Sequence, residues 1–136
     1  QVLLDFQKAW GRPTFDGWAV GGDCDNASTV TCDSQGMITK ISISDERLKG
    51  SIPASISNLQ SLEYLALWNS SLTGPIPTTI GNLPKLTDLE LCYNSLTGTI
   101  PASMGNLISL NYLWLIGNNL TGSIPATLSN LGLLTN

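Results

Sequence analysis

Four sets of residues recur every 24 positions along most of the chain. The leucines of one set are Leu62, Leu86, Leu110 and Leu134. The other three sets begin at Gly50, at the pair Ile52 and Pro53, and at Asn58, and each of them also occurs four times. Chance does not place four columns in phase over four cycles, so the chain is built from one structural unit repeated along the sequence.

Each cycle encodes a short strand, a turn and a return segment. Leucines at alternate positions, such as Leu65 and Leu67, predict a strand with one buried face. The glycine that follows tolerates backbone angles that other residues resist. The proline after each isoleucine fixes φ and removes a hydrogen-bond donor, so we expect an irregular or 3₁₀ return. One such coil cannot bury its own apolar edge, but stacked coils form a continuous column of Leu and Ile.

This cycle resembles the plant-specific leucine-rich repeat, as the segment 86–106 shows (LTDLELCYNSLTGTIPASMGN). The resemblance implies a right-handed solenoid, with a parallel β-sheet on its concave face and 3₁₀ or irregular structure on its convex side. Residues 36–136 are then about four repeats of 24 residues, without a C-terminal cap. The repeats begin at Ile38, Leu62, Leu86 and Leu110, with a stub at Leu134.

Residues 1–35 resemble the N-terminal cap of the same proteins. Four apolar residues of this segment have helical spacing on one face: Val2, Leu3, Phe6 and Trp10. The cap resemblance implies a disulfide between Cys24 and Cys32, which enclose seven residues. Cys92 has no partner in the chain, and we expect a free or half-buried thiol on the concave side.

The repeat asparagine of this family hydrogen-bonds the backbone of the turn and links neighbouring coils. Asn94 and Asn118 keep this residue, whereas Ser70 and Glu46 occupy the equivalent places in the earlier coils. Serine can make part of the same bond set. Glutamate is longer and charged, so the resemblance implies an irregular first coil.

Composition excludes several classes of function. The net charge is −4 without a run of Lys or Arg, so we expect neither nucleic-acid nor anionic-membrane binding. The chain has no histidine, which is the commonest general base and metal ligand. We therefore expect no catalytic residues, no metal site and no cofactor. No segment approaches the roughly 20 apolar residues that span a bilayer.

The concave face carries the candidate binding site, because strand residues between the core leucines point to solvent there. Sixteen positions meet this condition: Lys40, Ser42, Ser44, Asp45, Tyr64, Ala66, Trp68, Asn69, Asp88, Glu90, Cys92, Tyr93, Tyr112, Trp114, Ile116 and Gly117. Five of them are aromatic, and exposed Tyr and Trp give large contact area at low entropic cost. The alternative is that stacked aromatic residues only stabilise the sheet.

Nine of these residues form the predicted ligand-binding set: Lys40, Tyr64, Trp68, Asp88, Glu90, Tyr93, Tyr112, Trp114 and Ile116. Asp88 and Glu90 favour a basic or amine-bearing partner. Three asparagines, Asn26, Asn69 and Asn119, fit the N-glycosylation pattern. Together with the cap, they predict an extracellular protein, either secreted or on the outer face of the plasma membrane.

The resemblance implies a recognition module of a receptor-like protein or kinase, which binds a peptide, a protein ligand or a co-receptor. One alternative is a secreted inhibitor of cell-wall hydrolases, because the start of the chain resembles polygalacturonase-inhibiting proteins. A structural subunit is another, and an ice-binding surface on Thr73, Thr97 and Thr121 is a further one. The chain begins at Gln1 without Met and lacks a C-terminal cap. We therefore expect a trimmed segment whose last coil is covered by further repeats or by a partner.

Overall fold

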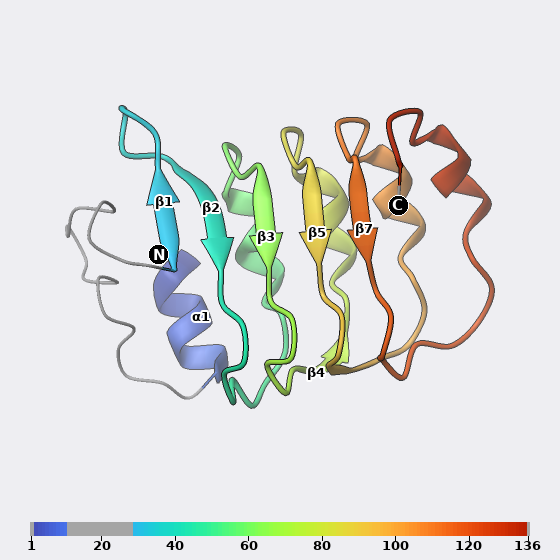
Figure 1. The fold of residues 1–136 in the computed structure, drawn as a ribbon, viewed down its shortest axis with the longest axis horizontal. Helices are drawn as coiled ribbons and strands as arrows, with labels where there is room; N and C mark the ends of the chain where they lie inside the picture. The colour runs from blue at the N-terminus through green and yellow to red at the C-terminus, as the bar shows by residue number, and fades with distance from the viewer. Residues whose placement is uncertain (1, 11–28, 136) are drawn as a thin grey trace.

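The computed structural model describes residues 2–10 and 29–135. A helix, α1 (Val2–Trp10), stands at one end of a row of stacked coils (Figure 1). Four coils contribute one strand each to a five-stranded sheet, and the segment before the repeats contributes the fifth. In spatial order the strands are β1 (Val30–Cys32), β2 (Ile38–Ser42), β3 (Tyr64–Ala66), β5 (Asp88–Glu90) and β7 (Tyr112–Trp114).

The strands of this sheet pair in a register of 24 residues. Lys40 lies beside Tyr64, Tyr64 beside Asp88, and Asp88 beside Tyr112, all in parallel pairs. Only β1, which precedes the repeats, pairs with its neighbour β2 in the antiparallel sense among these strands. The predicted parallel sheet is confirmed, and equivalent side chains of successive coils therefore stack in columns.

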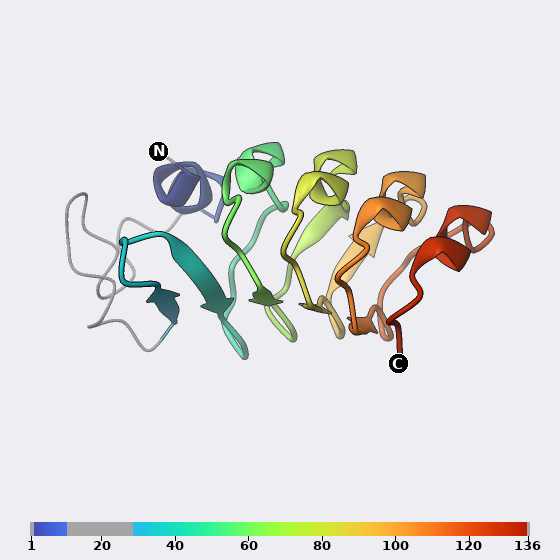
Figure 2. The same ribbon diagram turned by 90° about the horizontal axis from the view of Figure 1, so that it is seen from above.

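The return segments form 3₁₀ helices on the side opposite the sheet. They are η2 (Ala54–Asn58), η3 (Thr78–Asn82), η4 (Ala102–Asn106) and η5 (Ala126–Asn130). Each begins directly after a proline in extended conformation, because proline lacks the donor that would continue the preceding ladder. Figure 2 shows the coils in a gently curved row, with the sheet on the inner side and the 3₁₀ helices on the outer side.

A second, two-stranded parallel sheet was not predicted from the sequence. It joins β4 (Thr73–Pro75) to β6 (Ser95–Thr97), where an irregular turn was expected. Its register is 22 residues rather than 24, since Thr73 pairs with Ser95 and Pro75 with Thr97. A glycine with positive φ, Gly74 in β4, allows the turn out of this short strand. Successive coils are thus staggered by two residues on this side.

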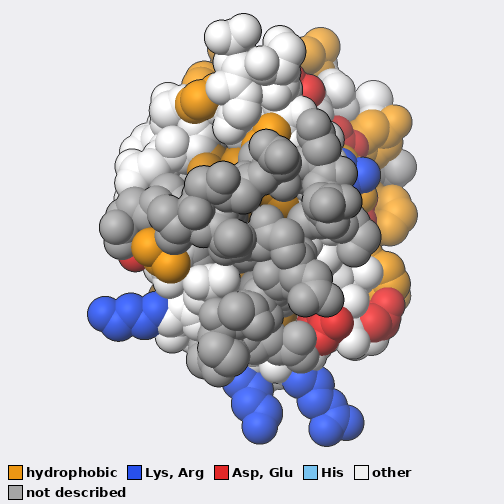
Figure 3. Space-filling model, turned by 90° about the vertical axis from the view of Figure 1, so that its left-hand side faces the viewer, with side chains coloured by type: hydrophobic (Ala, Val, Ile, Leu, Met, Phe, Trp, Pro, Cys, Tyr) orange, Lys and Arg blue, Asp and Glu red, His pale blue; other side chains and the backbone are white. Residues whose placement is uncertain are grey.

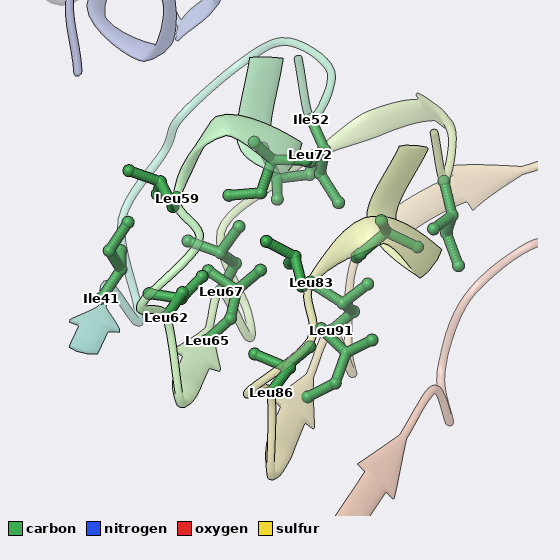
Figure 4. Packing of buried hydrophobic residues seen from close by; sticks show 14 of the residues in the cluster. Ile41, Ile52, Leu59, Leu62, Leu65, Leu67, Leu72, Leu83, Leu86 and Leu91 are labelled. Carbon is green, nitrogen blue, oxygen red and sulfur yellow. The ribbon is translucent and has the colours of Figure 1, made fainter. Parts of the chain in front are cut away.

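The core is a column of aliphatic side chains between the two layers (Figure 4). Leu62, Leu65 and Leu67 are fully buried in one coil, and Leu86 and Leu91 occupy equivalent places in the next. Burying each such side chain contributes about 1.5–3 kcal/mol. The predicted leucine and isoleucine column is confirmed.

Helix α1 closes the N-terminal end of this column. Phe6 and Trp10 are buried and stack with ring centroids 4.6 Å apart, and Trp10 Nε1 donates a 3.1 Å hydrogen bond to the Ser51 backbone oxygen. The helix reaches Gly50 so closely that a Cβ there would lie 2.1 Å from the Ala9 oxygen. Only glycine fits at this position, so the cap helix and the first coil pack backbone against backbone.

Parts of the cap prediction concern residues or side chains that the structure does not describe. Cys24, Asn26 and the side chains of Val2 and Leu3 lie outside the described structure. Cys32 forms a disulfide bond, and its pairing with Cys24 stays a prediction. The first coil departs from the later ones, because the positive φ moves from the glycine to the residue before it, Lys49 (φ 29°).

Two asparagines, of which Asn94 is buried and Asn118 half-buried, bind three successive coils to one another. Asn94 Oδ1 accepts hydrogen bonds of 3.0 Å from the backbone nitrogens of Ser70 and Leu72. Its Nδ2 donates to the Leu67 oxygen at 2.7 Å and to the Leu91 oxygen at 3.0 Å. Asn118 repeats this pattern one coil later, with bonds to the backbone of Leu91, Leu96 and Leu115.

Serine makes part of the same bond set in the preceding coil, as the sequence predicted. Ser70 is fully buried, and its hydroxyl lies 3.0 Å from the Trp68 oxygen and 3.3 Å from the Ile43 oxygen. The asparagine side chain has its acceptor oxygen and its donor nitrogen on separate atoms, and together they bond to two turns. Serine has only one hydroxyl group for this role. Glu46, at the equivalent place in the first coil, is half-buried.

Replacement of Asn94 tests this ladder. We expect Asn94→Ala to lower the free energy of unfolding by about 3 kcal/mol, because it leaves several buried backbone groups without a partner. Chemical denaturation of the 136-residue chain measures the change. Asn106→Ala, at an exposed asparagine, is the matched control and is expected to have little effect. Equal losses in the two variants would contradict the role of the ladder.

Candidate functional site

The sheet face consists of the side chains that project outward from β2, β3, β5 and β7 and from the residues after each strand. Register places them in four columns. The columns are Lys40–Tyr64–Asp88–Tyr112, Ser42–Ala66–Glu90–Trp114, Ser44–Trp68–Cys92–Ile116 and Asp45–Asn69–Tyr93–Gly117. The nine predicted binding residues thus lie on one continuous surface.

Exposure on the sheet face increases toward the C-terminal coils. Tyr93, Tyr112, Trp114 and Ile116 are 58%, 42%, 47% and 68% exposed. Lys40 is also exposed, whereas four residues are half-buried: Tyr64, Trp68, Asp88 and Glu90. Figure 3 views the molecule from its N-terminal end, and hydrophobic and acidic side chains project on the right, the side of the sheet. Basic side chains project mainly from the lower edge in this view.

Two of the sixteen positions are not open to solvent, contrary to the prediction. Ala66 is 0% exposed and Cys92 is 3% exposed. Both side chains are short. Cys92 is a free thiol, and its burial, followed by the nearby Glu90 charge, raises its pKa against the opposing effect of a backbone hydrogen bond. Cys92 is therefore a buried member of the sheet face.

A chain of three side chains crosses the first three coils of the face. The Lys40 ammonium lies 4.6 Å from the centre of the Tyr64 ring, within the range of a cation–π contact. The Tyr64 hydroxyl donates a 2.8 Å hydrogen bond to Glu90 Oε1. Burial, this hydrogen bond and the charges of Glu90 and Asp88 raise the pKa of Tyr64 to about 12. Tyr64 is therefore a neutral donor at physiological pH.

The fourth column runs along residues with left-handed backbone conformation. Positive φ occurs at Asp45 (58°), Asn69 (50°), Tyr93 (54°) and Gly117 (72°). Asn69 Nδ2 donates a 2.6 Å hydrogen bond to Asp45 Oδ1, which links the first two members. Asparagine and aspartate adopt this conformation readily, but a bulky aromatic residue does so at a cost.

Tyr93 rests on Gly117. A Cβ at Gly117 would lie 2.6 Å from Cδ1 of the tyrosine ring, so the ring covers the glycine backbone from one side. The other side of the ring contributes to its 58% exposure. Strained backbone conformations persist where the surrounding structure holds them, and they concentrate at functional sites. The packing of the Tyr93 ring on Gly117 was not predicted from the sequence. The available signal was the glycine that follows Tyr93 in the fourth column.

The acceptor asparagines differ in their surroundings. Asn69 is exposed on the sheet face, and its amide is engaged with Asp45. Asn119 is exposed beside the second sheet, where its backbone nitrogen donates to the Leu96 oxygen. Glycosylation of these two residues stays a prediction, as it does for Asn26.

The described residues contain no group of three side chains suited to hold a metal ion. Among the same residues, no helix is long and apolar enough to cross a membrane. Asp88 and Glu90 lie on an open sheet surface and contact hydroxyl groups, from Thr87 at 2.6 Å and Tyr64 at 2.8 Å. Sequence reasoning also missed Thr87, which lies one residue before the strand and orients Asp88.

The stacked coils, parallel sheet and asparagine ladder define a leucine-rich-repeat solenoid. The leucine-rich-repeat family model matches residues 61–83, 85–107 and 109–131. The chain therefore belongs to this family, and the plant-type repeat predicted from the sequence is confirmed. No curated protein matches the chain.

The chain is similar to three solved structures among others. The structure of PEPR1–AtPEP1 has a TM-score of 0.90 and 30% identity over 98% of this chain, which spans 20% of that protein. The ectodomain of the receptor kinase SOBIR1 from Arabidopsis thaliana has a TM-score of 0.85 and 26% identity, covering 99% of this chain and 74% of that one. A plant ice-binding protein has a TM-score of 0.68 and 33% identity, covering 96% and 51%.

Titration of Tyr64 tests the side-chain chain on the sheet face. Because its folded pKa lies near 12, above the ordinary value near 10, its contribution to stability is complete below pH 10 and is lost as the pH rises toward 12. Absorbance at 295 nm is expected to show one phenol that ionises near pH 12. Tyr64→Phe removes this step and Tyr112→Phe does not. A high-pH step that survives Tyr64→Phe would contradict the assignment.

Proposed function

We propose that this chain is an extracellular recognition module of a receptor-like protein or kinase, which binds a peptide or protein segment through its sheet face. The observation that carries the proposal is the contiguous exposure of Tyr93, Tyr112, Trp114 and Ile116 on one face. Exposed apolar patches with aromatic members mark interaction sites.

The surrounding structure supports binding over a purely structural role for these aromatics. A structural aromatic residue in a sheet is covered by its cross-strand neighbours. Tyr112 and Trp114 lie on β7, the last strand of the described sheet, and leave close to half of their surface in water. Tyr93 keeps an unfavourable backbone conformation while its ring remains exposed. Water-exposed aromatic surface on a rigid sheet is pre-organised for contact and loses little entropy on binding.

The comparisons support the cellular setting of the proposal. SOBIR1 is a receptor kinase whose matching part is its ectodomain, and PEPR1 was solved together with AtPEP1. By analogy, we assign an extracellular location and a peptide, protein or co-receptor partner to this chain. The repeats supply a scaffold, and the outward residues between the leucines supply the specificity.

Alanine replacement of two equally exposed isoleucines tests which face binds. Ile116 is on the sheet face and Ile108 follows η4, away from the strands, and both are 68% exposed. We expect Ile116→Ala to weaken binding about tenfold and Ile108→Ala to leave it unchanged. The ligands are peptides selected on the immobilised chain from a random 12-residue display library, and calorimetry gives the Kd. Equal behaviour of the two variants would exclude the sheet face as the binding surface.

The likeness to a plant ice-binding protein favours a second candidate function. Hydroxyl side chains beside the second sheet are exposed: Thr73, Ser95, Thr97, Thr99 and Thr121. The 22-residue register pairs Thr73 with Ser95 and Thr99 with Thr121. It also places Pro75 beside Thr97, so the threonine column of the sequence does not run straight across the strands.

Ice binding predicts thermal hysteresis at the freezing point of a solution of the chain. Thr97→Lys would abolish it, because a charged side chain interrupts the hydroxyl surface at its centre, and Thr79→Lys on η3 is the control. Nanolitre osmometry measures the effect. Absence of hysteresis in the unaltered chain would eliminate this candidate and leave the recognition module unaffected.

A further inference from the structure

Two carboxylates occupy the middle of the sheet face. Asp88 and Glu90 both project from β5, and both are half-buried. Register places Asp88 beside Tyr112 and Glu90 beside Trp114 on the exposed, C-terminal side. The carboxylates thus border the most exposed aromatic residues of the surface.

The hydrogen bonds that orient these carboxylates come from neutral groups. The Tyr64 hydroxyl donates to Glu90 Oε1 at 2.8 Å, and the Thr87 hydroxyl donates to Asp88 Oδ2 at 2.6 Å. A hydroxyl fixes the position of a carboxylate without cancelling its charge. The cation in this series of contacts is Lys40. It lies on the Tyr64 ring and belongs to the coil before that of Tyr64. The two negative charges therefore remain available to a cation that arrives from solvent.

The aromatic neighbours favour the same kind of ligand. Trp114 is 47% exposed, and an indole face attracts a cation within about 6 Å of its centre. A guanidinium group is planar, stacks on aromatic rings and donates hydrogen bonds in a fork that matches carboxylates. The combination of two oriented carboxylates with an exposed indole suits arginine better than the compact ammonium of lysine.

Apolar surface continues from this point along the sheet face. Ile116 follows Trp114 by one outward position, and Tyr93 is held on Gly117 in the next column. Outward positions on one strand are about 7 Å apart, which is also the spacing of alternate side chains in an extended chain. A single extended segment can therefore reach the carboxylates and the apolar surface together.

We propose that the sheet face binds an extended peptide or protein segment whose arginine side chain lies against Asp88, Glu90 and the Trp114 ring, with an adjacent apolar side chain on Tyr93 and Ile116. The inference rests on the proposed recognition function and names the chemistry of its ligand. Charge complementarity favours a basic occupant, because the sheet face carries three acidic residues and one basic residue. These are Asp45, Asp88 and Glu90, and Lys40. An acidic or phosphorylated segment would meet repulsion at the same place.

The experiment uses the 12-residue peptides selected on the unaltered chain. We expect arginine to be enriched among them, and replacement of that arginine by citrulline, a neutral isostere, to raise the Kd about tenfold or more. The double variant Asp88→Asn, Glu90→Gln should raise the Kd of the arginine peptide by a similar factor. It should not raise the Kd of the citrulline peptide further, because the two changes remove one interaction. Glu63→Gln, at an exposed carboxylate before β3, controls for the overall charge.

The outcomes separate this inference from the function on which it rests. Peptides that depend on Ile116 but tolerate citrulline would overturn the arginine subsite and leave the recognition function in place. Selected peptides that bind Ile116→Ala and Trp114→Ala as tightly as they bind the unaltered chain, or an empty selection, would overturn both. The citrulline comparison on the unaltered chain tests the arginine subsite even where the double variant fails to fold, which circular dichroism reports.

Discussion

Every coil of this protein depends on a hydrogen-bonded contact with the next, because a single coil satisfies neither its backbone nor its apolar edge. Asn94 shows the constraint most directly, since one side chain bonds backbone groups of its own turn and of the turn before. The leucines above and below can stack only if this spacing is kept. The ladder therefore sets the translation that aligns both the core columns and the columns of the sheet face.

Because the inward residues keep the coils aligned, the outward positions are not required for folding and can differ from coil to coil. Leu65, Leu89 and Leu113 share the inward column and must be alike, whereas their outward neighbours Tyr64, Asp88 and Tyr112 differ from coil to coil. In the first three coils the outward side chains contact one another. Lys40 lies over the Tyr64 ring, and the Tyr64 hydroxyl donates a hydrogen bond to Glu90. The last coils leave their aromatic residues in water. β7 is the last strand of the described sheet, so Tyr112 and Trp114 have a neighbouring strand on one side only.

The sequence predicted what depends on repetition and missed what depends on geometry within one coil. Phase alone predicted the parallel sheet, the buried leucines and the common face of the nine candidate binding residues. It did not predict the second sheet, because the 22-residue pairing of Thr73 with Ser95 departs from the 24-residue period of the sequence. The burial of Ala66 and Cys92 was also missed, since the alternation of side chains along a strand gives their direction and not their exposure.

The backbone conformation of Tyr93 supports the proposed binding role of the sheet face over a purely structural one. A tyrosine with φ of 54° loses stability relative to an asparagine or glycine at the same place, and the neighbouring coils carry Asn69 and Gly117 there. The fold thus tolerates the conformation easily with other residues, and tyrosine is the costly choice. Its ring is nevertheless exposed, so the cost is not recovered by burial in the chain itself. Contact with a second molecule would offset it, which is the energetic relation expected of a pre-organised binding surface.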